Sequence, residues 1–327
     1  MATLKALITV PYMTPGDGGD RLLREAGIET VFHTLHGHRS EAEMIELLTG
    51  IDAAIVGLDP FTPKVMDASP RLKVISRSGL GYDDVDVPAA TARGIVVCTT
   101  PGHIHTAVAE WTLALLLQGA RKVYENLHEG RSGGWKWYQG RDLATRTLGL
   151  VGLGAIGKAV AKRARAFEMQ VLAYDLVQDS AFAAQHGVTY VSLEDLLRAS
   201  DFVSLHLFLD AQSHHLINAD RLALMKRDAY LINTSRGGVL DSRALYDALT
   251  EGRIAGAALD VFEKEPLEPD SPLRSLKNLT ISPHCSGASD DPRSAQVLMA
   301  SENALRVLRG EKPLHAVNPE VLGRLRK

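Results

Sequence analysis

The chain has 327 residues, which is more than one typical domain holds, so two domains are expected. A net charge of −3 and a 23 % content of charged residues argue against a nucleic-acid or anionic-membrane binder. Two cysteines, Cys98 and Cys285, exclude a disulfide framework. The longest apolar helical run, near residues 111–117, is far too short to span a membrane. These features favour a cytoplasmic soluble protein.

Residues 1–100 alternate between predicted strands and predicted helices. Strands are expected at 4–10, 53–56, 72–76 and 95–98. Helices are expected at 20–26 and 41–48, the second of them capped by Ser40. This alternation is typical of parallel sheets with helical crossovers.

The middle of the chain begins where Thr99-Thr-Pro-Gly102 breaks that alternation. A long helical region is predicted from about residue 107 to 127, and the glycine-rich segment 130–135 interrupts it. Trp135 and Trp137 follow those glycines. We interpret the two tryptophans as core anchors, as simple interface packing, or as part of a loop that covers a neighbouring subunit's cleft.

A second alternating series starts near Thr147. Further strands are predicted at 171–174, 202–206, 229–233, 257–261 and 279–282. A helix over 292–309 closes the chain, and its position suggests that it returns to the first domain. The sequence therefore predicts an α/β protein with parallel sheets.

The run Leu148–Gly157 contains glycines at 152, 154 and 157, spaced G-x-G-x-x-G between a predicted strand and a helix over 158–168. Gly152 permits the tight turn, Gly154 lets the backbone approach a pyrophosphate, and Gly157 lets helix and strand pack closely. Asp175 ends the next strand, where an acidic residue binds the ribose hydroxyls. A carboxylate there favours NAD over NADP, because it repels a 2′-phosphate and Leu176 supplies no compensating cation.

Polar groups follow other predicted strands, where open α/β sheets bind ligands. Arg236 lies beside two glycines and suits bidentate binding of a carboxylate. Asp260 and Glu265 follow one strand, and His284 follows another. The glycine-rich loop 76–83 offers N–H groups for a small anion.

These residues together suit the reduction of a 2-keto acid. A nicotinamide supplies hydride, Arg236 holds the carboxylate, and His284 protonates the developing alkoxide, since imidazole titrates near neutral pH. Glu265 is the candidate that orients the imidazole and favours its charged form. Asp260 is expected to face the cofactor amide.

Several polar residues are expected to have no functional role. Glu263 and Glu268 are interpreted as a solvated acidic turn, and His214 and His215 as a solvated turn or helix start. Cys285 is expected to be an inert thiol. No histidines cluster with cysteines or carboxylates at metal-ligand spacing, so no metal site is expected.

The chain resembles the D-isomer-specific 2-hydroxyacid dehydrogenase family, which includes D-3-phosphoglycerate and hydroxypyruvate/glyoxylate dehydrogenases. The resemblance covers nearly the whole chain and rests on motifs in a fixed order. They are Ser78–Asp86, Pro101-Gly102 followed by Val108-Ala-Glu110, Gly152–Gly157 with Asp175, Ile232–Gly237, Gly256–Phe262, Glu265-Pro266 and Pro283-His284.

The resemblance implies two doubly wound parallel-sheet domains. A flavodoxin-like substrate domain is formed by residues 1–100 and 287–327, and a Rossmann cofactor domain, residues 101–286, is inserted into it. A homodimer is also implied, with the helix after residues 108–110 forming much of the contact.

The resemblance also implies roles for individual residues. Arg236, Glu265 and His284 match the family's catalytic residues. Those expected at the cofactor are Gly152, Gly154, Ala155, Ile156, Gly157, Asp175, His206, Thr234, Ser235 and Asp260. Those expected at the substrate are Arg77, Ser78, Gly79, Leu80 and Arg236.

The expected activity is NAD-dependent hydride transfer between nicotinamide and a small D-2-hydroxy acid or 2-keto acid that is phosphoglycerate-, glycerate- or glyoxylate-like. One alternative is a formate- or phosphite-type dehydrogenase of the same fold. Glu265 and Leu80 argue against it, because those enzymes carry Gln and Lys, respectively, at these positions. The other alternative is a non-catalytic dinucleotide-sensing binding protein, since the related corepressors retain the catalytic residues. Ile104, His105 and Phe208 depart from the family pattern and leave the choice of 2-hydroxy acid open.

Overall fold

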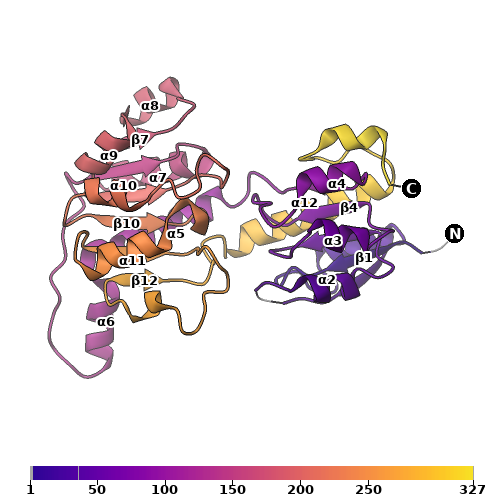
Figure 1. Cartoon of the computed structure of the whole chain (residues 1–327), viewed down its shortest axis with the longest axis horizontal. Coiled ribbons are helices and arrows are strands. Elements are labelled where there is room, and N and C mark those ends of the chain that lie inside the picture. The colour runs from indigo at the N-terminus through magenta and orange to yellow at the C-terminus, as the bar shows by residue number, and fades with distance from the viewer. Residues whose placement is uncertain (1–2, 36, 327) are drawn as a thin grey trace. The chain divides into compact units, whose positions relative to one another are not determined.

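The computed structural model describes residues 3–35 and 37–326. The chain folds as two compact units (Figure 1). Unit 1 consists of Met1–Ile104 and Ala288–Lys327, and unit 2 is the continuous segment His105–Gly287. Within the described residues, no helix is both long and apolar enough to cross a membrane.

The described strands of unit 1 form one parallel sheet in the order β2-β1-β3-β4-β5. One face of the sheet carries α1 and α12, and the other carries α2, α3 and α4. The strands are β1 (Lys5–Ile8), β2 (Glu29–Phe32), β3 (Ala53–Val56), β4 (Val74–Arg77) and β5 (Val96–Cys98). The helices are α1 (Gly18–Glu25), α2 (Glu41–Leu47), α3 (Pro63–Asp67), α4 (Val87–Ala92) and α12 (Asp290–Leu308), and a 3₁₀ turn, Pro319–Gly323, follows α12.

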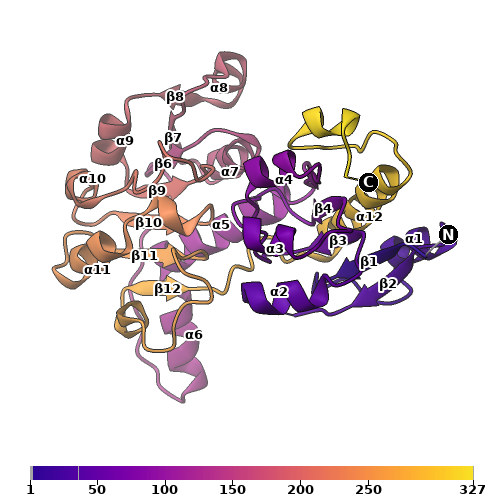
Figure 2. The same cartoon turned by 45° about the vertical axis from the view of Figure 1, so that its right-hand side comes forward.

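Unit 2 contains a seven-stranded parallel sheet in the order β12-β11-β10-β9-β6-β7-β8 (Figure 2). Its strands are β6 (Thr147–Val151), β7 (Gln170–Tyr174), β8 (Val188–Tyr190), β9 (Phe202–Leu205), β10 (Tyr230–Asn233), β11 (Gly256–Leu259) and β12 (Leu279–Ile281). Its helices are α5 (His105–Arg121), α6 (Val123–Arg131), α7 (Ala155–Ala166), α8 (Ser180–His186), α9 (Leu193–Ala199), α10 (Ala219–Leu224) and α11 (Ser242–Thr250). Short 3₁₀ turns cover Gly237–Val239 and Pro272–Ser275.

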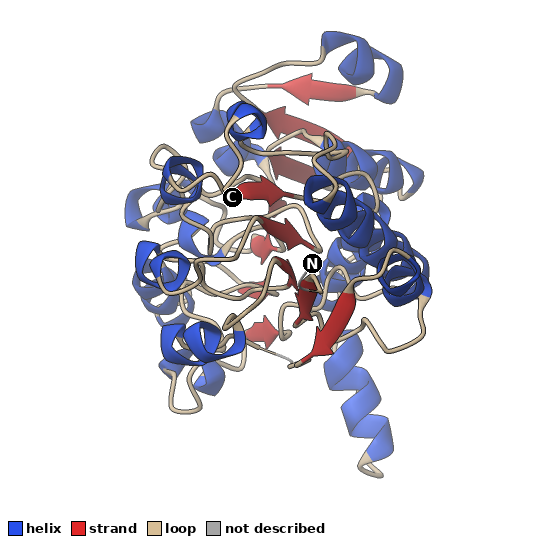
Figure 3. Ribbon diagram, turned by 90° about the vertical axis from the view of Figure 1, so that its right-hand side faces the viewer, coloured by secondary structure: helices blue, strands red, loops and turns tan. Residues whose placement is uncertain are grey.

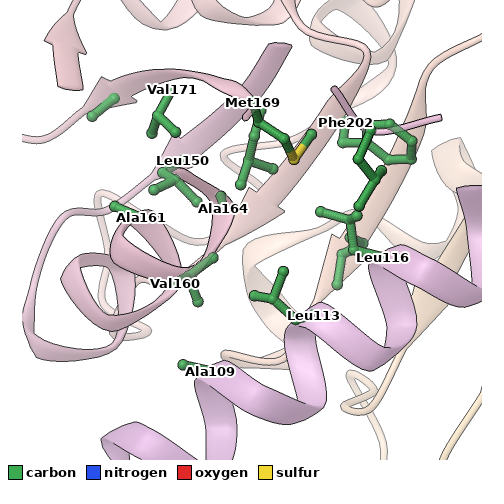
Figure 4. Packing of buried hydrophobic residues seen from close by; sticks show 14 of the residues in the cluster. Ala109, Leu113, Leu116, Leu150, Val160, Ala161, Ala164, Met169, Val171 and Phe202 are labelled. Carbon is green, nitrogen blue, oxygen red and sulfur yellow. The ribbon is translucent and has the colours of Figure 1, made fainter. Parts of the chain in front are cut away.

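Helices cover both faces of each sheet, so inner strands such as β3, β9 and β11 are fully buried and mostly apolar, whereas the edge strands β2, β8 and β12 are partly exposed. In unit 2, α5 and α7 pack on one face, where Leu116 of α5 lies next to Phe202 of β9, and Leu150 of β6 lies next to Ala164 of α7 (Figure 4). The helices α9, α10 and α11 pack on the opposite face. The strand orders, with helices on both faces (Figure 3), confirm the prediction of two doubly wound parallel-sheet domains.

Some element predictions were wrong in detail. The strand β2 was missed, because Glu29 and Thr30 interrupt the apolar pattern of this edge strand. The helix α7 begins at Ala155 rather than Lys158, directly after its N-cap Gly154. The long helical region divides at Lys122, whose φ of 52° ends α5 and starts α6.

The arrangement of unit 2 places its polar residues at one edge of the sheet. All its strand pairs are parallel, so their carboxyl ends lie along the same side. Gly152, Asp175, His206 and Asp260 each directly follow a strand there. Parallel pairing alone therefore collects residues that are more than a hundred positions apart.

Candidate functional site

The glycine turn after β6 leaves no room for side chains where the backbone must turn. Gly152 has a φ of 99°, and a Cβ there would lie 2.5 Å from the carbonyl oxygen of His206. A Cβ on Gly157 would lie 2.2 Å from the carbonyl oxygen of Gly152. Gly154, by contrast, has open space around its Cβ position and caps α7 without a side chain. The open N-terminus of α7 suits a phosphate group.

Asp175 lies beside this turn and is held by the backbone. Its Oδ2 accepts a hydrogen bond from Leu153 N at 2.7 Å, and its Oδ1 accepts one from Val177 N at 3.0 Å. The residues that follow, Leu176 and Val177, are exposed and uncharged. Lys158 is engaged elsewhere, since its Nζ lies 2.6 Å from Asp179. The carboxylate is thus presented without a neighbouring cation from its own loop.

His206 follows β9 and remains neutral. Burial lowers the pKa of its imidazole to about 3. Its Nε2 lies 3.0 Å from Ser204 Oγ, whereas its Nδ1 is buried without a hydrogen-bond partner in the structure. Such an orphaned atom is expected where a ligand completes the site. The open helix terminus, Asp175 and His206 fit a bound dinucleotide.

Arg236 is placed by the turn after β10. The side chain of Asn233 closes this turn, because its Oδ1 accepts from Ser235 N at 3.0 Å and its Nδ2 donates to Arg236 O at 2.9 Å. Thr234 Oγ1 lies 2.9 Å from Thr112 Oγ1 of α5. The guanidinium of Arg236 donates from Nη1 to Ser235 O at 2.8 Å. The backbone of this turn thus fixes the position from which the side chain of Arg236 extends.

Asp260 organises the loop that carries His284. Its side chain is fully buried and accepts from Ser282 Oγ at 2.5 Å, Cys285 N at 3.0 Å and Ser286 N at 2.8 Å. The amide of His284 donates to the Asp260 carbonyl at 2.8 Å, and His284 has a φ of 48°. This left-handed conformation is unusual outside glycine and persists where the surroundings impose it. The predicted contact of Asp260 with the cofactor amide stays a prediction.

His284 and Glu265 form a close pair. Nδ1 of the imidazole lies 2.6 Å from Oε2 of Glu265, and Oε1 of the same carboxylate accepts from Phe262 N at 2.9 Å. The carboxyl group is more buried than the imidazole, with side-chain exposures of 13 % and 28 %. Because Nδ1 faces Glu265, Nε2 is the ring nitrogen that can exchange a proton with a ligand.

The thiol next to His284 is not activated. Burial, followed by the nearby charge of Asp260, raises the pKa of Cys285 to about 11. An activated cysteine shows the opposite shift. This direction agrees with the expectation that Cys285 is inert.

In unit 1, the loop after β4 is shaped by its own contacts. Arg77 is buried, and its Nε donates to Gly81 O at 3.0 Å while its Nη1 lies 3.4 Å from Asp84. Tyr12 donates to Ser78 Oγ at 3.0 Å, and Gly79 O accepts from Thr100 N at 2.9 Å. Leu80 lies in the same loop. Substrate binding by these residues stays a prediction, and Arg77 has a visible structural role.

Two residues expected to be merely solvated are in fact paired. Glu263 Oε2 lies 3.0 Å from His215 Nε2, and Glu263 Oε1 accepts from Ser242 N at 2.8 Å. Glu263 is exposed, as the interpretation of a solvated acidic turn expected, but that interpretation did not include its contact with His215. No local pattern joins residues 48 positions apart in sequence, so only the three-dimensional structure brings out this pair. Glu268, as expected of a surface residue, pairs with exposed Lys264.

A family model for the NAD-binding domain of D-isomer specific 2-hydroxyacid dehydrogenases matches residues 113–286, which lie within unit 2. The chain belongs to this family. A glyoxylate reductase from Korarchaeum cryptofilum is 46 % identical over 290 residues, covering 86 % of this chain and 87 % of the relative. The resemblance found in the sequence is thereby confirmed.

Solved structures agree with this assignment. A Thermus thermophilus protein matches 96 % of this chain and 100 % of its own, with a TM-score of 0.87 and 41 % identity. An NADPH-dependent glyoxylate/hydroxypyruvate reductase from Sinorhizobium meliloti, solved with NADP and malonate, matches 97 % and 98 % with a TM-score of 0.82 and 30 % identity. The chain is an oxidoreductase of the D-2-hydroxyacid dehydrogenase type, with a domain for NAD(P).

The state of Cys285 can be tested by alkylation. With a pKa of about 11, less than about one thiol in a thousand is ionised at pH 7.5, so labelling by iodoacetamide should be slow there and rise until above pH 10. A Cys285→Ser variant provides the blank, since Cys98 is buried. Labelling at pH 7.5 as fast as that of a small free thiol would contradict this description.

Proposed function

We propose that this protein is an NADH-dependent reductase of small 2-keto acids, with glyoxylate and hydroxypyruvate as its substrate class. The observation that carries the proposal is the 2.6 Å contact between His284 Nδ1 and Glu265 Oε2 in a domain of the dehydrogenase family. The names of the relatives support the substrate class, because they are glyoxylate and hydroxypyruvate reductases.

Proton transfer is assigned to His284. Glu265, held by Phe262 N, accepts a hydrogen bond from Nδ1 and so orients the imidazole. Nε2 then donates its proton to the substrate oxygen as the C2 carbonyl becomes an alcohol. In the reverse direction the neutral imidazole takes the proton back. Proton and hydride together balance the reduction of a keto acid to a hydroxy acid.

Arg236 is assigned to the substrate carboxylate. A guanidinium offers a planar pair of donors that matches a carboxylate, and its charge polarises the adjacent carbonyl. The turn closed by Asn233 sets the origin of this side chain. For unit 1 by itself, the loop Arg77–Leu80 is proposed to bind an anionic group of the substrate through its N–H groups, with Arg77 holding the loop in shape.

The cofactor is assigned to the glycine turn and its surroundings. Its pyrophosphate would be held by the N–H groups of Gly154, Ala155 and Ile156 at the start of α7, and its ribose by Asp175. His206, Thr234, Ser235 and Asp260 would surround the rest. When bound, the nicotinamide supplies the hydride that the protein itself lacks.

Asp175 predicts a preference for NADH over NADPH. A 2′-phosphate placed against the carboxylate would be repelled by a few kcal/mol at intermediate dielectric, so we expect discrimination of about 100-fold or more in kcat/KM. The measurement is the initial rate with each cofactor at saturating glyoxylate. Equal kcat/KM values, or a preference for NADPH like that of the Sinorhizobium relative, would refute the cofactor assignment.

Variants of the His284–Glu265 pair test the proposed chemistry. His284→Ala should lower turnover by about 10²–10⁴-fold, the usual effect of losing a general acid, with NADH affinity retained. Glu265→Gln should move the alkaline limb of the pH–rate profile for reduction to lower pH, because it removes the negative charge that lies 2.6 Å from the imidazole. A Glu265→Gln profile that superimposes on the wild type would refute the pairing.

The protein is further proposed to be a homodimer. The helix α6 buries none of its residues within the chain, and it projects from the body of unit 2 (Figures 1 and 2). Tyr124 and Leu127 on α6 are largely exposed, and Trp135 on the following loop is 97 % exposed. Exposed apolar patches of this kind mark interfaces, and a second copy of the chain is the proposed occupant.

Light scattering after size exclusion tests the dimer. We expect a species of twice the 35.4 kDa chain mass, and we expect Leu127→Glu combined with Trp135→Ala to yield the monomer. Leu314→Glu, at an exposed leucine of unit 1, is the matched control and should leave the dimer intact. A monomeric wild type would overturn the assignment.

A further inference from the structure

Unit 2 contains a second histidine–carboxylate pair in addition to that of His284 and Glu265. His215 Nε2 lies 3.0 Å from Glu263 Oε2, and both side chains are about one-third exposed. His215 has a φ of 48°, so its backbone is held in the left-handed region. The pair joins the loop after β9 to the segment after β11.

The backbone of His215 also holds the turn that follows Arg236. The amide of His215 donates to Gly238 O at 2.8 Å, and Ile217 N donates to Val239 O at 3.0 Å. The other side of this turn lies directly on the segment after β11. A Cβ on Gly237 would be 1.9 Å from the carbonyl carbon of Phe262 and 2.3 Å from Glu263 N. The turn is therefore enclosed between His215 and the Phe262–Glu263 backbone.

Glu263 is two residues from Glu265 and fixes the same stretch of chain. Its Oε1 accepts from Ser242 N at the start of α11, while its Oε2 faces His215. The backbone N–H of Phe262, the residue before Glu263, donates to Glu265 Oε1 at 2.9 Å. The segment that carries the proposed catalytic carboxylate is thus held by the hydrogen bonds of Glu263 and packs closely against Gly237.

The charges around the second pair favour an ionised Glu263. Burial opposes ionisation, but the hydrogen bonds from Ser242 and His215 outweigh it and lower the pKa of Glu263. Asp241 Oδ2 lies 4.0 Å from His215 Nδ1, and the ring of His214 stacks on that of His215. Arg243 and Lys264 line the same open pocket of about 400 Å³, so solvent reaches the pair.

From these contacts we infer that His215 and Glu263 are positioning residues for Glu265. They clamp the Phe262–Glu265 segment against the Arg236 turn, and this keeps Glu265 Oε2 within hydrogen-bonding distance of His284 Nδ1. The inference rests on the proposed function, because its readout is the proton transfer by His284. Neither residue touches substrate or cofactor in this account.

Losing the clamp should change chemistry more than binding. If Glu265 is held less firmly, its negative charge lies farther from the His284 imidazole, so keto-acid reduction slows and its alkaline limb moves to lower pH. NADH affinity should not change, because the glycine turn and Asp175 lie on other loops. A positional error of about 1 Å costs up to about 100-fold in rate, so a partial loss of about tenfold in kcat is expected.

The experiment compares pH–rate profiles for glyoxylate reduction by the dimeric protein and its variants. Glu263→Ala should lower kcat about tenfold and shift the alkaline limb in the same direction as Glu265→Gln, but less far, with the dissociation constant for NADH unchanged. Glu263→Gln should retain near-wild-type behaviour, since its amide can accept from Ser242 N and donate to His215. Glu251→Ala is the matched control: it removes a surface ion pair with Arg253 and should change neither kcat nor the pH–rate profile.

A second variant, at His215, separates the loss of the His215–Glu263 contact from any misfolding of Glu263→Ala. His215→Asn keeps a residue that tolerates positive φ but is too short to reach Glu263, so it should reproduce the shift. Combining it with Glu263→Ala should add little, because both changes break one interaction. A Glu263→Ala profile that superimposes on the wild type, or additive effects in the double variant, would overturn the inference.

If Glu265→Gln shifts the limb and Glu263→Ala does not, the inference fails while the proposed function stands. If Glu265→Gln also leaves the limb unmoved, the proposed function fails.

Discussion

The parallel direction of the strands in unit 2 is the constraint on which the proposed site depends. Every strand of this sheet ends at the same edge, so the residues that follow the strands lie along that edge. Gly152, Asp175, His206, Asp260 and His284 reach the site in this way, although they span more than a hundred residues of sequence. Short loops with few degrees of freedom then determine where each side chain points.

Burial distinguishes the groups that can move a proton from those that cannot. The imidazole of His206 is held neutral by its surroundings, and the thiol of Cys285 stays protonated, so neither changes its charge near neutral pH. His284 differs because its Nδ1 has a carboxylate at 2.6 Å. A charged imidazole needs such a partner in a partly buried site. Burial thus holds His206 and Cys285 neutral, whereas His284 lies beside a carboxylate.

The sequence predicted the parts of the site that follow apolar strands. Arg236 and Asp260 each come after a run of buried residues, whereas His284 follows the half-buried strand β12. The glycines at 152 and 157 have a direct steric cause that the structure bears out. The contacts between loops could not be predicted. His215 and Glu263 carry no periodic signal, and the closeness of Gly237 to Phe262 is a property of two turns meeting in space. Local polarity likewise concealed the edge strand β2, which pairs with β1 through its backbone.

The most direct test of the account is the chirality of the alcohol formed from hydroxypyruvate and NADH. In the proposed site, Arg236 would hold the carboxylate and His284 would face the oxygen, so only one face of the carbonyl would be open to the hydride donor. Family membership sets which face, so the product should be D-glycerate, and His284→Ala should form it at least about 100-fold more slowly. L-glycerate, a racemic product, or an unimpaired His284→Ala enzyme would contradict the central claim.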